Sequence, residues 1–208
     1  MICLLYVAIC KRRFFMLKNR DRKIAFTVKR IVFDALFAAM FFALSLIAVE
    51  IAGVKITLVS LATVVCAMMY GTVDAVIVGL LGAFLEQLIK YGITATTLLW
   101  IMPAGIRALI IGLGARSLGS KMTIDTVISD RKPYVYFAVC ILAGVATSLS
   151  NTLVYYVDAK LYGYYNYALI FGALGVRLFT GVLSSLVTAV MAIPILAALK
   201  KARIAPER

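Results

Sequence analysis

Apolar residues form long runs in this chain, and charged residues gather in the short gaps between the runs. A transmembrane helix needs about 20 predominantly apolar residues to cross the hydrocarbon core of a bilayer. By that measure the pattern predicts six spans, of which the second is short and the last is longer than one crossing requires. The predicted spans lie at about 31–49, 56–70, 73–89, 98–115, 134–157 and 167–199. We therefore expect an all-α integral membrane protein, built as a six-transmembrane-helix bundle.

The composition supports this class, because hydrophobic residues make up 64% of the 208 residues and charged residues only 15%. A water-exposed surface cannot be assembled from so few polar residues, whereas a lipid-facing surface can. We expect one membrane domain over residues 28–200, preceded by a basic segment, 1–27, and followed by a basic tail, 201–208. Met16 is an alternative start to Met1, and the sequence leaves that choice open.

The distribution of Lys and Arg predicts the orientation of the chain in the membrane. These residues concentrate in the N-terminal segment, in the loop 116–133 and at the C-terminal end. An even number of spans puts all three segments on one side, and the positive-inside rule identifies that side as the cytoplasm. Both termini are then cytoplasmic, and the loops near 50–55, 91–97 and 158–166 face outward.

The same bias accounts for the formal charge of +13, which comes from 22 Lys and Arg against 9 Asp and Glu. Because no basic face is interleaved with exposed aromatic residues, we expect no nucleic-acid partner. The chain has no histidine, which removes His-based metal sites and the general base of most hydrolytic triads. Of the four cysteines none forms a CxxC pair, and Cys66 and Cys140 lie in apolar runs, as small buried hydrophobes do. We expect no catalytic residue, no metal and no cofactor.

Two arginines lie deep within predicted spans. Arg107 is about ten residues into the fourth span, or ~15 Å along a helix, and Arg177 is at a similar depth in the last. An ionisable group at membrane depth is a functional hypothesis by default, although a structural ion pair or a snorkelling side chain would explain it equally well. Both readings stay open from the sequence.

A second group of polar residues lies toward the predicted outer ends of the spans. Glu86 and Lys90 are i,i+4 neighbours and could form an ion pair. In the fifth span Asn151, Tyr155 and Asp158 follow a four-then-three spacing, which predicts one shared helical face. That face could hold interhelical hydrogen bonds or a ligand.

Aromatic residues gather at the same end, where Trp100 follows the threonine-rich loop 91–97 and several tyrosines lie in or beside the loop 158–166. They are typical of interfacial anchors, but small-molecule sites also combine aromatic walls with a few placed polar groups. The convergence of the two kinds of residue predicts a binding site at the outer end.

Small residues recur every fourth position in the first span, at Ala35, Ala39 and Ala43, a spacing that lets helices approach closely. They belong to the stretch DALFAAMFFALS, which precedes the longer stretch KITLVSLATVVCAMMYGTVDAVIVGLLGAFLEQLIKYGITATTLLWIMPAGIRALIIG. With about six spans and predicted cytoplasmic termini, residues 28–200 resemble the substrate-binding S components of energy-coupling factor (ECF) vitamin transporters, in particular the folate-type branch.

The resemblance implies a multi-pass protein of the bacterial plasma membrane that captures a vitamin at the outer face. The ligand would be folate-like first, and pantothenate- or hydroxymethylpyrimidine-like next. The resemblance also implies a transmembrane coupling subunit and two ATPase subunits as partners, with Ala35, Ala39 and Ala43 as the docking face. The expected substrate-binding residues, assigned by location, are Glu50, Lys55, Glu86, Gln87, Tyr91, Thr96, Trp100, Arg107, Asn151, Tyr155, Asp158 and Arg177.

Two other classes of function remain as alternatives. A stand-alone carrier or channel would be expected to show an internal repeat or a continuous polar path, and neither is evident in the sequence. A membrane-embedded enzyme would need paired carboxylates or a nucleophile motif, and none is evident either.

Overall fold

The structure is a computed structural model that describes residues 28–51, 54–117 and 133–201. The predicted basic segment 1–27, the loop residues 118–132 and the tail from 202 onward lie outside the described residues. The chain divides into two units, 1–32 and 33–208. Of the first unit only the start of helix α2 is described, and the account below concerns the second.

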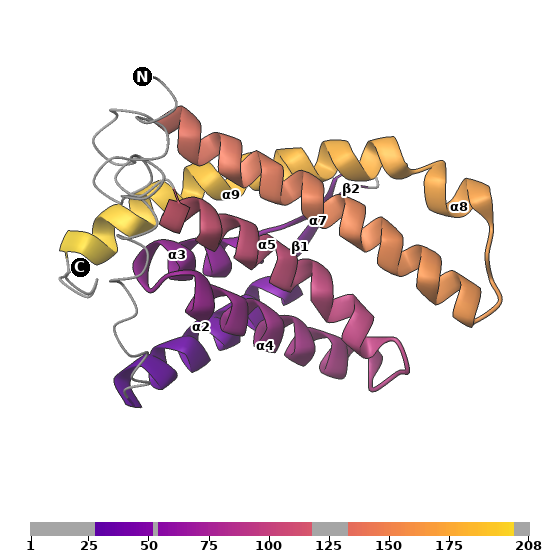
Figure 1. The fold of residues 1–208 in the computed structure, drawn as a ribbon, viewed down its shortest axis with the longest axis horizontal. Helices are drawn as coiled ribbons and strands as arrows, with labels where there is room; N and C mark the ends of the chain where they lie inside the picture. Colours follow the sequence, from indigo (N-terminus) through magenta and orange to yellow (C-terminus); the bar gives the residue numbers. More distant parts are fainter. Residues whose placement is uncertain (1–27, 52–53, 118–132, 202–208) are drawn as a thin grey trace, which may run out of the picture. The chain divides into compact units, whose positions relative to one another are not determined.

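Helices correspond to five of the six predicted spans, which confirms the all-α membrane class (Figure 1). They are α2 (Val28–Leu46), α4 (Thr72–Tyr91), α5 (Thr97–Ser117), α7 (Pro133–Leu161) and α9 (Leu174–Lys201). Among the described residues, α4, α5, α7 and α9 are long and apolar enough to cross a membrane. Their outward faces carry large apolar side chains, such as Leu98 at 75% and Phe179 at 68% exposed. Such faces are stable against lipid and not against water.

The predicted second span is wrong in its details. Residues 48–57 form an antiparallel hairpin of β1 (Ala48–Ile51) and β2 (Val54–Thr57), and the helix that follows, α3 (Ser60–Met69), has only ten residues. Val, Ile and Thr favour extended backbone, and an extended residue advances about twice as far as a helical one. Laid end to end, β2 and α3 cover about 28 Å, close to the thickness of a bilayer core.

Helix α3 lies at the centre of the second unit. All ten of its residues are buried, and it packs against α4, α5 and α9. A helix that is apolar on every side belongs in the interior of a bundle. Its first residue is polar, and the Ser60 hydroxyl lies 2.8 Å from the Thr188 hydroxyl of α9. This hydrogen bond ties the start of α3 to the middle of α9.

Helices α7 and α9 lie side by side and cross at glycines (Figure 1). A Cβ atom added at Gly144 would come within 2.8 Å of the Gly181 carbonyl oxygen and 2.9 Å of the Ser185 Cβ. Only residues without a side chain allow backbones this close. The crossing sets the separation of two helices whose outer ends carry predicted site residues.

The predicted last span is divided. A short helix, α8 (Tyr167–Phe171), precedes α9, and residues 172–173 form a turn between them. The Asn166 side chain caps α8 by accepting a hydrogen bond from the Ala168 amide at 3.0 Å. The turn explains why the apolar stretch is longer than one crossing requires.

Candidate ligand-binding site

Five of the predicted site residues lie together at one end of the helices. Thr96 and Trp100 lie at the start of α5, Tyr155 and Asp158 near the end of α7, and Arg177 near the start of α9. Because α7 runs antiparallel to α5 and α9, these ends meet on the predicted outer side. We call these five residues and Tyr164, from the loop after α7, the outer cluster.

Aromatic rings form the body of the outer cluster. The Tyr155 ring centroid lies 6.4 Å from that of Trp100 and 6.1 Å from that of Tyr164, with tilted planes in both pairs. The Arg177 guanidinium carbon lies 4.9 Å from the Tyr155 centroid, which is cation–π geometry. Tyr155 is therefore the common neighbour of two rings and one cation.

Asp158 is the acidic member of the outer cluster and is 8% exposed. Its carboxylate accepts a hydrogen bond from the Tyr164 hydroxyl and also interacts with the side chains of Thr96 and Trp100. The hydrogen bond to this carboxylate is the main cause that raises the pKa of Tyr164 to about 12. Tyr164 therefore remains a donor at physiological pH.

Local hydrogen bonds position the remaining members. The Thr94 amide donates to the Thr97 hydroxyl at 2.8 Å, which shapes the turn that places Thr96 in the interior. Arg177 donates from Nη1 to the Ile170 carbonyl at 3.3 Å, and its own carbonyl accepts from the Ser148 hydroxyl at 3.1 Å. The guanidinium is thus held at the junction of α7, α8 and α9.

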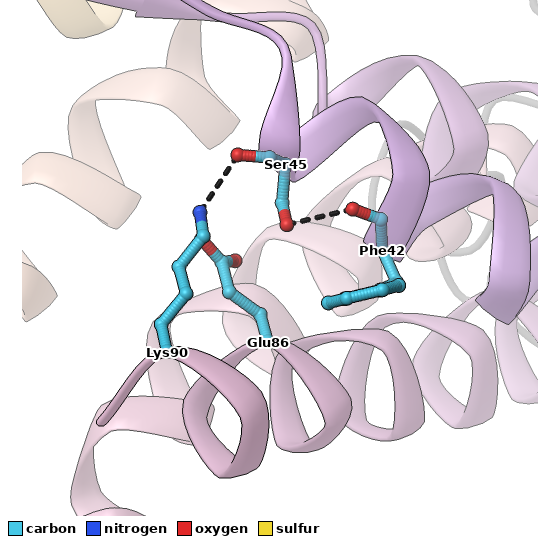
Figure 2. A network of polar contacts seen from close by, with 4 residues as sticks. All are labelled: Phe42, Ser45, Glu86 and Lys90. Atoms are coloured by element: carbon cyan, nitrogen blue, oxygen red, sulfur yellow. Dashed lines mark hydrogen bonds and ion pairs between the residues drawn. The ribbon is translucent and has the colours of Figure 1, made fainter. Parts of the chain in front are cut away.

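The predicted site residue Glu86 lies in a different network, shown in Figure 2. Its carboxylate pairs with the Lys90 ammonium at 2.8 Å, and Lys90 also donates to the Ser45 carbonyl at 2.7 Å. The Ser45 hydroxyl in turn donates to the Phe42 carbonyl at 2.7 Å. Carbonyls in the last turn of a helix have no intrahelical partner, so Lys90 caps the end of α2. The structure thus gives Glu86 the ion-pair role that the sequence left open.

Three other predicted outer residues, Gln87, Tyr91 and Asn151, do not join the outer cluster. Tyr91 is 64% exposed, and Gln87 is half-buried. Asn151 is exposed, whereas Asp158 is buried, although their spacing in α7 places them on nearly the same helical face. Glu50 and Lys55 are opposite each other in the register of β1 and β2, and their side chains lie outside the described part of the chain.

Arg107 lies at the middle of α5, away from the outer cluster. Its Nε donates to the Thr147 hydroxyl at 3.1 Å, and that hydroxyl donates to the Ala143 carbonyl at 2.6 Å. The side chain lines a small cavity between α3, α5, α7 and α9. Among the described residues, no group of three or more Cys, Asp or Glu side chains lies close enough to hold a metal ion.

Sequence reasoning missed several residues of these networks. Tyr164 was one of many tyrosines in its loop, and only the fold shows that its hydroxyl reaches Asp158. Thr147 and Ser45 carried no signal, because a hydroxyl that bonds within the membrane looks in sequence like any other small residue.

Ala35, Ala39 and Ala43 are exposed along α2, as a contact surface for another protein requires.

Comparison with known proteins gives two matches. A family described as "ECF-type riboflavin transporter, S component" matches residues 25–201. A solved structure of ThiT from Listeria monocytogenes superposes with a TM-score of 0.64 at 20% identity, covering 84% of this chain and 96% of that one. At that identity the likeness shows the fold alone. No curated protein matches the chain significantly.

Proposed function

Because this chain belongs to the family of ECF-type riboflavin transporter S components, we propose that it captures a flavin at the outer end of its helices and passes it to an ATP-driven coupling module. The family match supports a vitamin-binding S subunit in the plasma membrane. We propose three things beyond this: which vitamin is bound, which residues hold it and which partners couple it to ATP.

The observation that carries the proposal is the outer cluster. A flat heteroaromatic ring is recognised by aromatic faces, by a cation that can donate hydrogen bonds and by an acceptor for ring N–H groups. Trp100, Tyr155 and Tyr164 provide the faces, Arg177 the cation and Asp158 the acceptor. These groups come from three helices and a loop, so a ligand bound there would connect all of them.

Riboflavin is the first ligand to test, because the family description names it and its three-ring system suits these faces. A folate-like ligand, predicted from the sequence, also carries a flat fused ring and remains the second candidate. Pantothenate has no ring to stack, so the aromatic part of the cluster gives it less support.

The experiment is to purify the full chain in detergent from rich medium and to identify co-purifying vitamins by mass spectrometry. Quenching of riboflavin fluorescence then measures affinity. Tyr155→Ala removes the ring that contacts Trp100 and Arg177, and we expect it to weaken binding by about 10- to 100-fold. Tyr134→Ala is the matched control, because Tyr134 is an exposed tyrosine at the opposite end of the same helix. Equal binding by both variants would remove the outer cluster from the site.

The coupling step is tested separately on α2. Ala35, Ala39 and Ala43 form an exposed stripe of small residues, which suits close contact with a helix of another subunit. Ala39→Trp should abolish uptake in cells while riboflavin binding by the purified protein stays unchanged. Normal uptake by this variant, or accumulation of riboflavin in vesicles that contain only this chain, would contradict the coupling proposal.

A further inference from the structure

Asp158 is the acceptor that the proposed function offers to the vitamin, and its carboxylate already has partners in this structure. It accepts a hydrogen bond from the Tyr164 hydroxyl and also interacts with the side chains of Thr96 and Trp100. Asp158 is 8% exposed, so little of the carboxylate is open to a ligand. An incoming N–H group must therefore take the place of one of these three donors.

The three donors differ in how firmly the fold holds them. Thr96 is 2% exposed in the turn before α5, and Trp100 is half-buried in the first turn of that helix. Tyr164 is 41% exposed and lies in the loop between α7 and α8. A hydroxyl near water can exchange its hydrogen bond for one to water, whereas a buried hydroxyl that leaves its partner stays unsatisfied. Tyr164 is therefore the donor that costs least to displace.

The backbone beside Tyr164 leaves room for this displacement. The Tyr162 amide donates to the Asp158 carbonyl at 3.0 Å and closes the last turn of α7. Gly163 follows with φ of +76°, and a Cβ atom added there meets nothing within 4 Å. The chain turns back at this glycine, which is how Tyr164 reaches a carboxylate six residues before it. The open space around Gly163 lets the loop shift without moving α7.

From this geometry we infer that Tyr164 is an internal competitor for Asp158, whose hydroxyl fills the ligand's place until a vitamin with a ring N–H donor displaces it. This role rests on the proposed function of the outer cluster. Riboflavin carries such a donor at its imide nitrogen, and the pterin ring of folate carries one beside a carbonyl group. A ligand without this donor breaks the hydrogen bond and gains none in return, so the contact selects for a ring N–H. The Tyr164 ring remains available as an aromatic face.

The first test measures riboflavin affinity of the purified full chain by fluorescence quenching. Tyr164→Phe keeps the ring and removes the competing hydroxyl, so it should bind riboflavin about 10-fold more tightly, the effect of one hydrogen bond to a charged group. Tyr165→Phe is the matched control, because it removes the next hydroxyl along the loop, from a ring that packs on Tyr156 instead. This control should bind as the natural protein does.

Thermal unfolding in detergent gives a second readout. Without ligand, Tyr164→Phe should lower the unfolding midpoint, because the free protein loses the hydrogen bond to Asp158. At a saturating riboflavin concentration the midpoints of this variant and the natural protein should coincide, because the hydroxyl no longer contacts Asp158 in either. A hydroxyl that only held the fold together would leave the same difference with and without riboflavin.

A modified ligand tests the donor that replaces the hydroxyl. Riboflavin methylated on the imide nitrogen keeps the three-ring system and brings no N–H group to the carboxylate. The natural protein should bind it about 10-fold more weakly than riboflavin. Equal affinity for the two flavins would overturn the inference.

The outcomes separate this inference from the proposed function. If riboflavin binds the natural protein but binds Tyr164→Phe no more tightly, the inference fails and the proposed function stands. If folate binds and riboflavin does not, the flavin proposal fails, and the comparison of Tyr164→Phe with Tyr165→Phe in folate decides the inference. Binding of neither vitamin would refute both.

Discussion

The close crossing of α7 and α9 makes Gly144→Ala a sharp test of the structure. The added Cβ would lie 2.8 Å from the Gly181 carbonyl oxygen and 2.9 Å from the Ser185 Cβ. Ordinary contacts of a Cβ atom begin at 3.4 Å, so the two helices must separate by about half an ångström. The nearest obstacle is the Ser185 hydroxyl oxygen, which can rotate away, but the Gly181 carbonyl oxygen is backbone and cannot.

Overpacking of this kind typically costs about 1–3 kcal/mol of folding free energy. The effect also reaches the outer cluster, because Arg177 lies one turn from Gly181 and contacts Tyr155 of α7 at 4.9 Å. We therefore expect Gly144→Ala to lower the thermal unfolding midpoint in detergent and to weaken riboflavin binding measured by fluorescence quenching.

Gly175→Ala is the matched control for this prediction. Gly175 is also in α9, and a Cβ atom added there meets nothing within 4 Å. Since alanine is the better helix former, this variant should be as stable as the natural protein or slightly more stable. Ser185→Gly combined with Gly144→Ala should recover part of the loss, because it removes one of the two obstacles. An unchanged midpoint for Gly144→Ala alone would show that the helices are not this close.

Three further predictions concern single side chains. Lys90→Met removes the cap on the Ser45 carbonyl and should destabilise the protein by about 1 kcal/mol in thermal unfolding, and no change would mean that the cap does not hold α2. Tyr164→Phe should abolish the tyrosine that ionises with a pKa of about 12 in an alkaline absorbance titration. Because that pKa is raised above its usual value of 10, the hydrogen bond from Tyr164 to Asp158 contributes its full stabilisation below pH 10 and loses it as the pH rises through about 12. A titration curve that is the same with and without the substitution would refute the assignment. Arg177→Gln removes the cation over its neighbouring ring and should weaken riboflavin binding by about 2- to 30-fold, whereas undiminished affinity would exclude it from the site.

Hydrophobic patterning alone predicted most of the helices, because the bilayer leaves the backbone few choices. A chain that crosses hydrocarbon must satisfy its peptide groups internally, so long apolar runs become helices. Polar residues within such runs are costly, which is why Arg177 was a site candidate from the sequence. Thr96, Trp100, Tyr155 and Asp158 were candidates because polar and aromatic residues gather at the outer ends of the spans. Their common position at one end followed from alternating helix directions.

Only the tertiary structure decided which of these residues touch. Asp158 and Asn151 lie seven residues apart and so on nearly the same face of α7, and Asp158 alone is buried because Tyr164, Thr96 and Trp100 interact with it at the outer end of the helix. The hairpin of β1 and β2 replaces part of a predicted helix because extended backbone is tolerated where it packs against protein, as β2 does against α9. The sequence determined which segments enter the membrane, since that depends on the composition of each run. Contacts between segments depend on how far apart the segments lie, and the residue pattern of one segment does not specify that distance. Examples are Tyr164 with Asp158 and Gly144 with Gly181.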